Sequence, residues 1–332
     1  MPDFQIALQT SPAQVYVGRY LQRPYPQLVP MQEFVCDVGI TANCNVIVTD
    51  CVWRVYAGDD VFAVRQLIGA GLMTLTGGDV SVSPEAGLAF RRCYFLEPAL
   101  LALTRLRVSV HAYEVETLQM LSAQLDVPLL YYEQKAELRL PLAEGAWYAI
   151  MGNDWTDLHK AEPVSQAFAY DFVKLGPDGH IYANSGLHNV DHYAWNQPVL
   201  APAPGKVLWV RDGMPDATPG QAPDLSLLQT DPRLMTGNSM VIGHGHGECS
   251  YFGHLQAGSL AVAEGDYVRR GQVIARVGNS GVSQGPHLHY HLQNGPSLFV
   301  DQGLPVQFSR FVMTGDLVEQ GVLPSRAIVS PA

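Results

Sequence analysis

The sequence predicts an all-β protein of two domains, a β-sandwich-like domain over residues 1–145 and an antiparallel β domain over residues 146–332. The length of 332 residues fits two domains of roughly 150 residues each. Short runs of β-branched and aromatic residues, separated by Gly and Pro turn signals, recur along the chain. With 47% hydrophobic and 15% charged residues, the chain has ample apolar material for a core.

The N-terminal half contains the clearest strand pattern. Residues 103–113 alternate, with Leu106, Val108 and Val110 on one face of an extended chain. The apolar spacing becomes helical over residues 113–125, where we expect one short helix. This half holds no combination of catalytic residue types, so its predicted role is packing, positioning or recognition.

Charge and hydropathy exclude two classes of protein. The net charge of -11 provides no basic excess to neutralise phosphates, so we expect no nucleic-acid partner. No apolar run reaches the ~18 residues of a transmembrane helix, so no membrane span is expected. No secretory signal is expected from the N-terminal residues. The sequence leaves the oligomeric state open.

The five cysteines are odd in number and form no Cys-x-x-Cys pair. They are interpreted as buried apolar thiols. The alternative is one disulfide between two of Cys36, Cys44 and Cys51, if the protein is exported.

The histidines are crowded into the C-terminal half. Of the 11, only His111 lies before His159. His287, His289 and His291 alternate along Gly285–Leu292, and alternate residues of a strand share a face. Imidazoles on one strand face can present a metal ligand beside a general base. The alternative is a polar surface strand that happens to be rich in histidine.

Two further segments carry candidate residues. The segment 237–255 contains His244, His246 and His254. Asp171 is a single carboxylate within an apolar strand, where a charge is costly unless it is paired or bound to a metal. The alternative for Asp171 is a strand-end carboxylate that accepts backbone hydrogen bonds.

These segments occur in a recognisable order. The run is Gly-Asn-x-x-Val-Ile-x-His, Tyr-x-x-His-Leu, Glu-Gly-Asp-x-Val-x-x-Gly-Gln-Val-Ile-Ala-x-Val-Gly-Asn-Ser-Gly and Gly-Pro-His-Leu-His. Over residues 169–311 it resembles the lysostaphin-type, LytM-like zinc metallopeptidases, also called glycyl-glycine endopeptidases. The resemblance implies an antiparallel β fold of the duplicated hybrid type, with one zinc per chain at the floor of a groove.

The resemblance also implies roles for individual residues. Asp171 and His289 match two of the zinc ligands, and His254 and His287 match the pair beside the zinc-bound water. The open zinc position would hold a water of lowered pKa. One neutral imidazole would take the water proton, and the other would stabilise the oxyanion or protonate the leaving amine.

The identity of the first histidine ligand is open. The family pattern has a histidine four residues before the aspartate, and Ala167 stands there in this chain. We expect His159, further upstream, to be this ligand. The alternatives are a site that has lost the ligand or one of three other histidines, namely His180, His188 or His192.

Four other polar residues are not expected to bind the metal. His244 and Asn238 match recurrent family positions and are expected behind the ligands or along the groove. His246 and His291 fit no ligand position, so we expect them to be solvent-exposed or to line the groove.

The function implied by the resemblance is a zinc-dependent hydrolase, an endopeptidase that cleaves peptide bonds of bacterial cell-wall peptidoglycan. Its location would be the cell envelope, periplasmic or extracellular, although no signal peptide is visible. One alternative is a catalytically degenerate relative that binds or regulates. Another is a carrier module with Lys206 in a hairpin, which lacks the usual Met partner.

Overall fold

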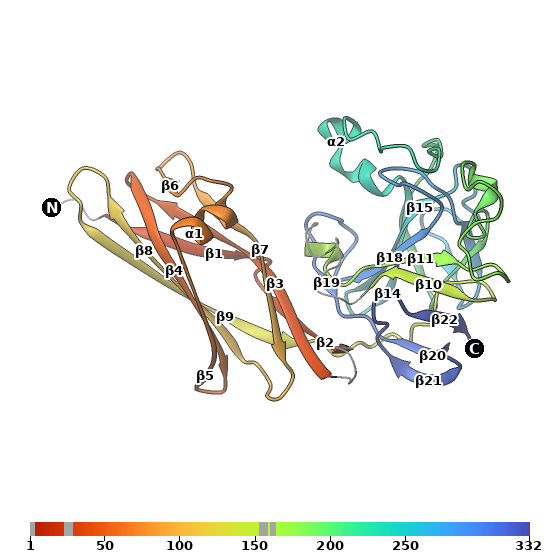
Figure 1. Cartoon of the computed structure of the whole chain (residues 1–332), viewed down its shortest axis with the longest axis horizontal. Helices are drawn as coiled ribbons and strands as arrows, with labels where there is room; N and C mark the ends of the chain where they lie inside the picture. Colours follow the sequence, from red (N-terminus) through yellow and green to blue (C-terminus); the bar gives the residue numbers. More distant parts are fainter. Residues whose placement is uncertain (1–3, 23–28, 153–158, 160–163) are drawn as a thin grey trace. The chain divides into compact units, whose positions relative to one another are not determined.

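The computed structural model describes residues 4–22, 29–152, 159 and 164–332. It divides into two compact units, Met1–Tyr132 and Glu133–Ala332, and strands dominate both (Figure 1). The all-β prediction is confirmed. The division falls before the predicted boundary at residue 145, because residues 133–145 pack with the second unit.

In its described part, the N-terminal unit contains nine strands and one short helix. Their order is β1 (Ile6–Ser11), β2 (Val15–Gln22), β3 (Val29–Ala42), β4 (Val46–Ala57), β5 (Asp60–Ile68), α1 (Gly69–Thr76), β6 (Ser81–Val82), β7 (Leu88–Pro98), β8 (Arg105–Glu114) and β9 (Met120–Tyr131). The strand order is β1-β3-β2-β9-β8-β4-β5, with β7 on β3 and β6 on β4. The pairs are antiparallel except β2 with β9.

The core of this unit lies between its β3–β7 part and its β4–β8 part. Phe34 on β3 stacks on Phe95 of β7, with ring centroids 4.6 Å apart. Trp53 on β4 contacts both Phe95 and Phe90 of β7. Aromatic pairs of this kind stabilise a core beyond the area they bury.

All five cysteines of the chain are buried and free.

The predicted helix over residues 113–125 is wrong. The segment is a β-hairpin, in which β8 ends at Glu114 and β9 begins at Met120. The Glu114 carboxylate accepts hydrogen bonds from the Glu116 and Thr117 amides and thereby closes the turn. Leu118 is exposed in the turn, so the apolar spacing did not mark a buried helical face.

The C-terminal unit combines strands and short helical turns with long loops. Its strands are β10 (Trp147–Met151), β11 (Tyr170–Lys174), β12 (Pro198–Leu200), β13 (Gly205–Arg211), β14 (Asn238–Gly245), β15 (Glu248–Leu255), β16 (Tyr267–Val268), β17 (Val273–Arg276), β18 (Leu288–Gln293), β19 (Gly303–Leu304), β20 (Phe308–Met313), β21 (Asp316–Gly321) and β22 (Ile328–Pro331). Its helices are η2 (Val164–Gln166), η3 (Asn189–Asp191), α2 (Leu227–Thr230) and η4 (Pro232–Thr236). In the described part of the chain, no helix has the length and apolar character needed to cross a membrane.

The main sheet of this unit brings the candidate residues together. Its order is β16-β13-β14-β15-β18-β11-β10-β22-β20-β21, so β18 lies between β15 and β11. In the register, His289 of β18 faces Asp171 of β11 on one side and Gly253 of β15 on the other. Strands far apart in sequence therefore place a carboxylate and an imidazole side by side.

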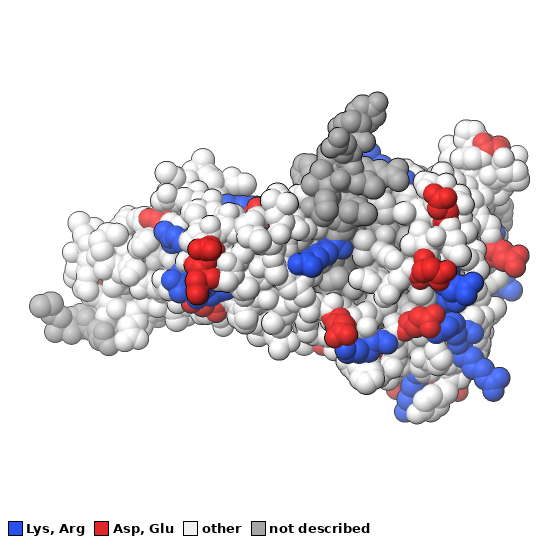
Figure 2. Space-filling view, turned by 90° about the horizontal axis from the view of Figure 1, so that it is seen from below, with Lys and Arg blue, Asp and Glu red and all other residues white. Residues whose placement is uncertain are grey.

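The surface carries charges of both signs. Acidic and basic side chains intermingle over the face shown in Figure 2. Several form ion pairs, such as Arg107 with Asp126 at 2.6 Å and Arg270 with Glu137 at 3.3 Å. Exposed pairs of this kind contribute little to stability, since water screens them.

Glu248 fixes the start of the C-terminal unit to the sheet. Its buried carboxylate accepts the backbone N–H groups of Lys135 and Ala136 at 2.5 and 2.7 Å. In Glu248→Gln the amide nitrogen would face one of these donors and leave it unsatisfied. We expect a loss of about 1–3 kcal/mol in the free energy of unfolding, measured by urea denaturation.

A matched control is available for this prediction. Glu133→Gln alters an exposed carboxylate whose partner is the Lys135 side chain, so little change is expected. Hydrogen exchange at residues 135 and 136 should be faster only in Glu248→Gln. An unchanged exchange rate there would show that other contacts hold this segment.

Candidate metal centre

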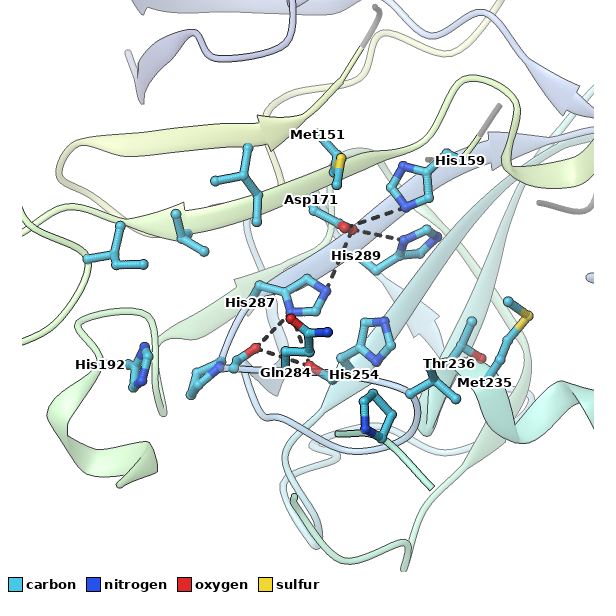
Figure 3. Close-up of a pocket in the computed structure, with 18 of the residues that line it drawn as sticks. Met151, His159, Asp171, His192, Met235, Thr236, His254, Gln284, His287 and His289 are labelled. Carbon is cyan, nitrogen blue, oxygen red and sulfur yellow. Dashed lines mark hydrogen bonds and ion pairs between the residues drawn. The ribbon is translucent and has the colours of Figure 1, made fainter. Parts of the chain in front are cut away.

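Three buried side chains converge at the centre of the C-terminal unit. One ligand atom each from His159, Asp171 and His289 lies within 4.8 Å of the others. His159 Nε2 is 3.4 Å from Asp171 Oδ2, and His289 Nδ1 is 3.0 Å from Asp171 Oδ1 (Figure 3). Two imidazole nitrogens and a carboxylate oxygen therefore face a common point.

Strand alternation explains why Asp171 is available there. Its neighbours Tyr170 and Phe172 are buried and stack on each other, with centroids 5.7 Å apart. Because successive side chains of a strand point to opposite faces, these aromatic residues direct Asp171 to the other face. There it meets His289 of the neighbouring strand.

The charge of Asp171 is stabilised by its neighbours. Burial raises the pKa of the carboxyl, but His159, His287 and His289 together lower that pKa below its usual range. Burial also lowers the pKa of His289. The site thus combines an ionised carboxylate with a neutral imidazole, the protonation states in which both bind a metal.

This donor set fits a zinc ion. Catalytic zinc sites use three protein ligands drawn from His, Asp, Glu and Cys, and keep a fourth position open. His159, Asp171 and His289 supply that number and type of ligand. Their burial also suits a metal site, because a buried carboxylate is costly unless it is paired or bound to a metal.

Two further imidazoles lie beside the cluster. Nδ1 of His254 donates to the Ser280 carbonyl at 2.7 Å, and Nδ1 of His287 donates to the Gly285 carbonyl at 2.8 Å. A carbonyl oxygen only accepts, so each ring, when it is neutral, carries its lone pair on Nε2. The two ring centroids are 4.5 Å apart, and His287 Nε2 is 3.7 Å from Asp171 Oδ1.

The backbone of His254 is unusual. Its φ of 56° lies in the left-handed region, which is uncommon for a residue other than glycine. Strained backbone tends to occur at functional sites, where it re-aims a side chain. Burial, followed by the neighbouring His287 and His289, lowers the pKa of His254 well below that of a free imidazole. His254 is therefore neutral and able to accept a proton.

The cluster opens into a cavity of about 450 Å³. In Figure 3, Met151 lies beside His159, while Met235 and Thr236 lie beside His254. Among the described residues that line the cavity, Asp171 is the only one with a charged carboxylate, and none is Lys or Arg. The cavity wall combines apolar side chains with the polar groups of the cluster, a mixture that is typical of ligand sites.

The other candidates for the first ligand do not join the three converging side chains. His180 and His188 are not part of the cavity wall in the described residues. His192 lines the cavity, but its Nε2 interacts with the Gly186 carbonyl at 3.0 Å. In the described part of the chain, only His159 joins Asp171 and His289 in a three-ligand group.

Asn238 and His244 are not brought to the cluster. The Asn238 side chain is hydrogen-bonded to the backbone of Met214 and Leu255, and so anchors the loop before β14. The His244 ring bonds the Ser250 hydroxyl and the Pro204 carbonyl.

His291 differs from its prediction, whereas His246 is exposed as expected. His291 is fully buried, and its Nδ1 lies 2.9 Å from Nε2 of His289. The expectation of an exposed or groove-lining His291 is therefore wrong, because the strand face that carries the ligand continues into the protein. The same alternation reaches Gln293, which sequence reasoning did not consider.

Comparisons with known proteins single out this unit. Residues 189–301 match the model of Peptidase family M23. Over 54 residues the chain is 50% identical to DD-carboxypeptidase/endopeptidase Mpg of Neisseria meningitidis serogroup B, covering 16% of this chain and 12% of Mpg. Over 93 residues it is 37% identical to peptidoglycan DD-endopeptidase ShyA of Vibrio cholerae, covering 28% of this chain and 20% of ShyA. The chain thus spans an eighth to a fifth of these relatives.

Solved structures give weaker similarity. The catalytic domain of lysostaphin from Staphylococcus simulans is 19% identical, with a TM-score of 0.27 over 48% of this chain and 88% of that domain. A zinc-containing peptidase from Vibrio cholerae is 13% identical, with a TM-score of 0.28 over 91% of this chain and 72% of that protein.

Proposed function

Since the C-terminal unit contains a domain of peptidase family M23, we propose that this chain is a zinc-dependent endopeptidase acting on cell-wall peptidoglycan. One observation carries the proposal. His159, Asp171 and His289 converge in a cavity beside two imidazoles, His254 and His287, whose Nε2 atoms carry lone pairs. Metal ligands and candidate bases thus share one site.

The catalytic roles follow from the tautomers. Bound zinc would polarise the scissile carbonyl and acidify the attacking water. His254 and His287 each hold an Nε2 acceptor fixed by a backbone carbonyl. One accepts the water proton, and the protonated ring then stabilises the oxyanion or donates to the leaving amine. The Asp171 carboxylate lies 3.7 Å from Nε2 of His287, so its negative charge would stabilise a proton taken up by that ring during the reaction.

The relatives support the substrate class. ShyA is named a peptidoglycan DD-endopeptidase, and Mpg a DD-carboxypeptidase/endopeptidase. A cavity of about 450 Å³, with no Lys or Arg among the described residues that line it, suits a short stretch of peptide with uncharged groups next to the scissile bond.

Zinc content and hydrolysis test the proposal together. The purified protein should contain about one zinc per chain by elemental analysis and should cleave purified peptidoglycan peptides. A strong chelator should abolish cleavage, and added zinc should restore it. His246→Asn is a matched control, because His246 is an exposed histidine at a φ of 54°, which Asn tolerates.

Two results would overturn the proposal. A folded protein that takes up no zinc would not be a metallopeptidase and would fit a catalytically degenerate binding module. Cleavage that survives complete removal of zinc would place the activity in other residues.

A further inference from the structure

A buried row of hydrogen bonds runs behind the candidate metal ligand His289. Nε2 of His289 lies 2.9 Å from Nδ1 of His291, and Nε2 of His291 lies 2.8 Å from Oε1 of Gln293. Nε2 of Gln293 donates to the Gly295 carbonyl at 2.7 Å. His289, His291 and Gln293 are all buried and occupy alternate positions of β18, so they share one face.

The Gly295 carbonyl determines which group donates and which accepts in each hydrogen bond of this row. The Gly295 carbonyl only accepts, so the Gln293 amide must turn its nitrogen there and its oxygen toward His291. The amide oxygen also only accepts, so His291 carries its proton on Nε2. A neutral His291 then has a lone pair on Nδ1, and His289 must donate to it from Nε2.

The hydrogen bond from His289 to His291 determines which form of Nδ1 faces Asp171. With its proton on Nε2, His289 has a lone pair on Nδ1, and this Nδ1 lies 3.0 Å from the carboxylate oxygen Oδ1 of Asp171. Two acceptors at this distance repel each other unless a cation lies between them. Without the row, Nδ1 of His289 would carry the proton and donate it to Asp171.

We propose that His291 and Gln293 are positioning residues that hold His289 in the tautomer required of a metal ligand. This inference rests on the proposed function, because it assigns the lone pair of His289 to a zinc ion. Neither residue lines the cavity in the described part of the chain, so neither is placed to touch a substrate. Both act through the donor atom of His289.

Tyr251 keeps His291 in place. The two residues are partners across β15 and β18, and their rings stack with centroids 4.7 Å apart and planes 12° apart. The Tyr251 hydroxyl is hydrogen-bonded to Thr236 at 2.8 Å. The orientation of the His291 ring is therefore set by packing as well as by its two hydrogen bonds.

The affinity for zinc tests the proposal. His291→Leu removes the acceptor for His289, and we expect zinc affinity, measured by competition with a chromophoric chelator, to fall about 10–100-fold. His291→Asn can place its side-chain oxygen near the position of Nδ1, so it should bind zinc more tightly than His291→Leu. Equal affinities for the wild type and a folded His291→Leu would overturn the proposal.

A second measurement does not depend on zinc binding or on a variant. Nitrogen-15 NMR distinguishes the two tautomers of a histidine ring, and it can be applied to the zinc-free wild-type protein. We expect His289 to carry its proton on Nε2. A proton on Nδ1 would overturn the proposal.

Failure of the proposed function and failure of this inference can be told apart. If the wild type binds no zinc, the proposed function fails, whereas the NMR result still reports on the row of hydrogen bonds.

Gln293→Met is the replacement variant if His291→Leu does not fold. Without the amide oxygen, His291 can adopt either tautomer, so His289 should show a mixture of tautomers. A tautomer of His289 unaltered from the wild type would contradict the role of Gln293.

Discussion

Asp171→Asn should abolish zinc binding and peptide hydrolysis together while leaving the fold intact. Asn has nearly the same shape as Asp, so packing on β11 should be kept. The change removes the only carboxylate among the described residues that line the cavity. We expect zinc affinity to fall by on the order of 100-fold or more, since changes to groups behind the ligands already cost about 10–100-fold. Elemental analysis and circular dichroism measure the two outcomes.

The same assay compares the three ligand candidates. His289→Ala should behave like Asp171→Asn, because it removes a buried ligand. His159→Ala is the most informative variant, since the sequence offers several histidines for this ligand position. Retained zinc and activity in His159→Ala would move the ligand to another residue. Retained zinc in Asp171→Asn would contradict the whole assignment.

His254→Asn should keep zinc and lose rate. Asn is preferred to Ala at this position, because the φ of 56° is tolerated by Asn. The variant removes the Nε2 acceptor but none of the three converging ligand atoms. We expect kcat to fall about 10²–10⁴-fold, the usual contribution of a general acid or base.

His287→Ala is the companion variant. The rings of His254 and His287 lie together, so their contributions to the rate should not be additive, and the double variant should be little slower than the slower single variant. Zinc content of each variant is the control. Loss of zinc in His254→Asn would indicate that His254 is itself a ligand. One of the three proposed ligands would then have another role.

The sequence was most informative where a pattern was local. Alternation along β18 predicts correctly that His289 and His291 share a face, because side-chain direction in a strand depends only on parity. The β character of both units follows from the same kind of pattern. The approach of Asp171 to His289 is a property of strand pairing between β11 and β18. No local pattern predicts it, whereas the family resemblance implies it.

Other features depend on tertiary context. A run such as Val115, Leu118 and Leu121 has helical spacing, yet a carboxylate of Glu114 closes a turn there and Leu118 is exposed. The burial of His291 could not be predicted from its residue type, since histidine is as common at surfaces as in interiors. It depends on how far the sheet face is covered.

The apolar side of β18 also determines the chemistry. Leu288, Tyr290 and Leu292 are fully buried and alternate with the histidines. A shift of this strand by one residue would turn His289 away from the cavity and the apolar side chains toward it, and the cost of that exchange forbids it. These buried apolar residues thus fix the register of β18, and with it the position of the donor atom of His289.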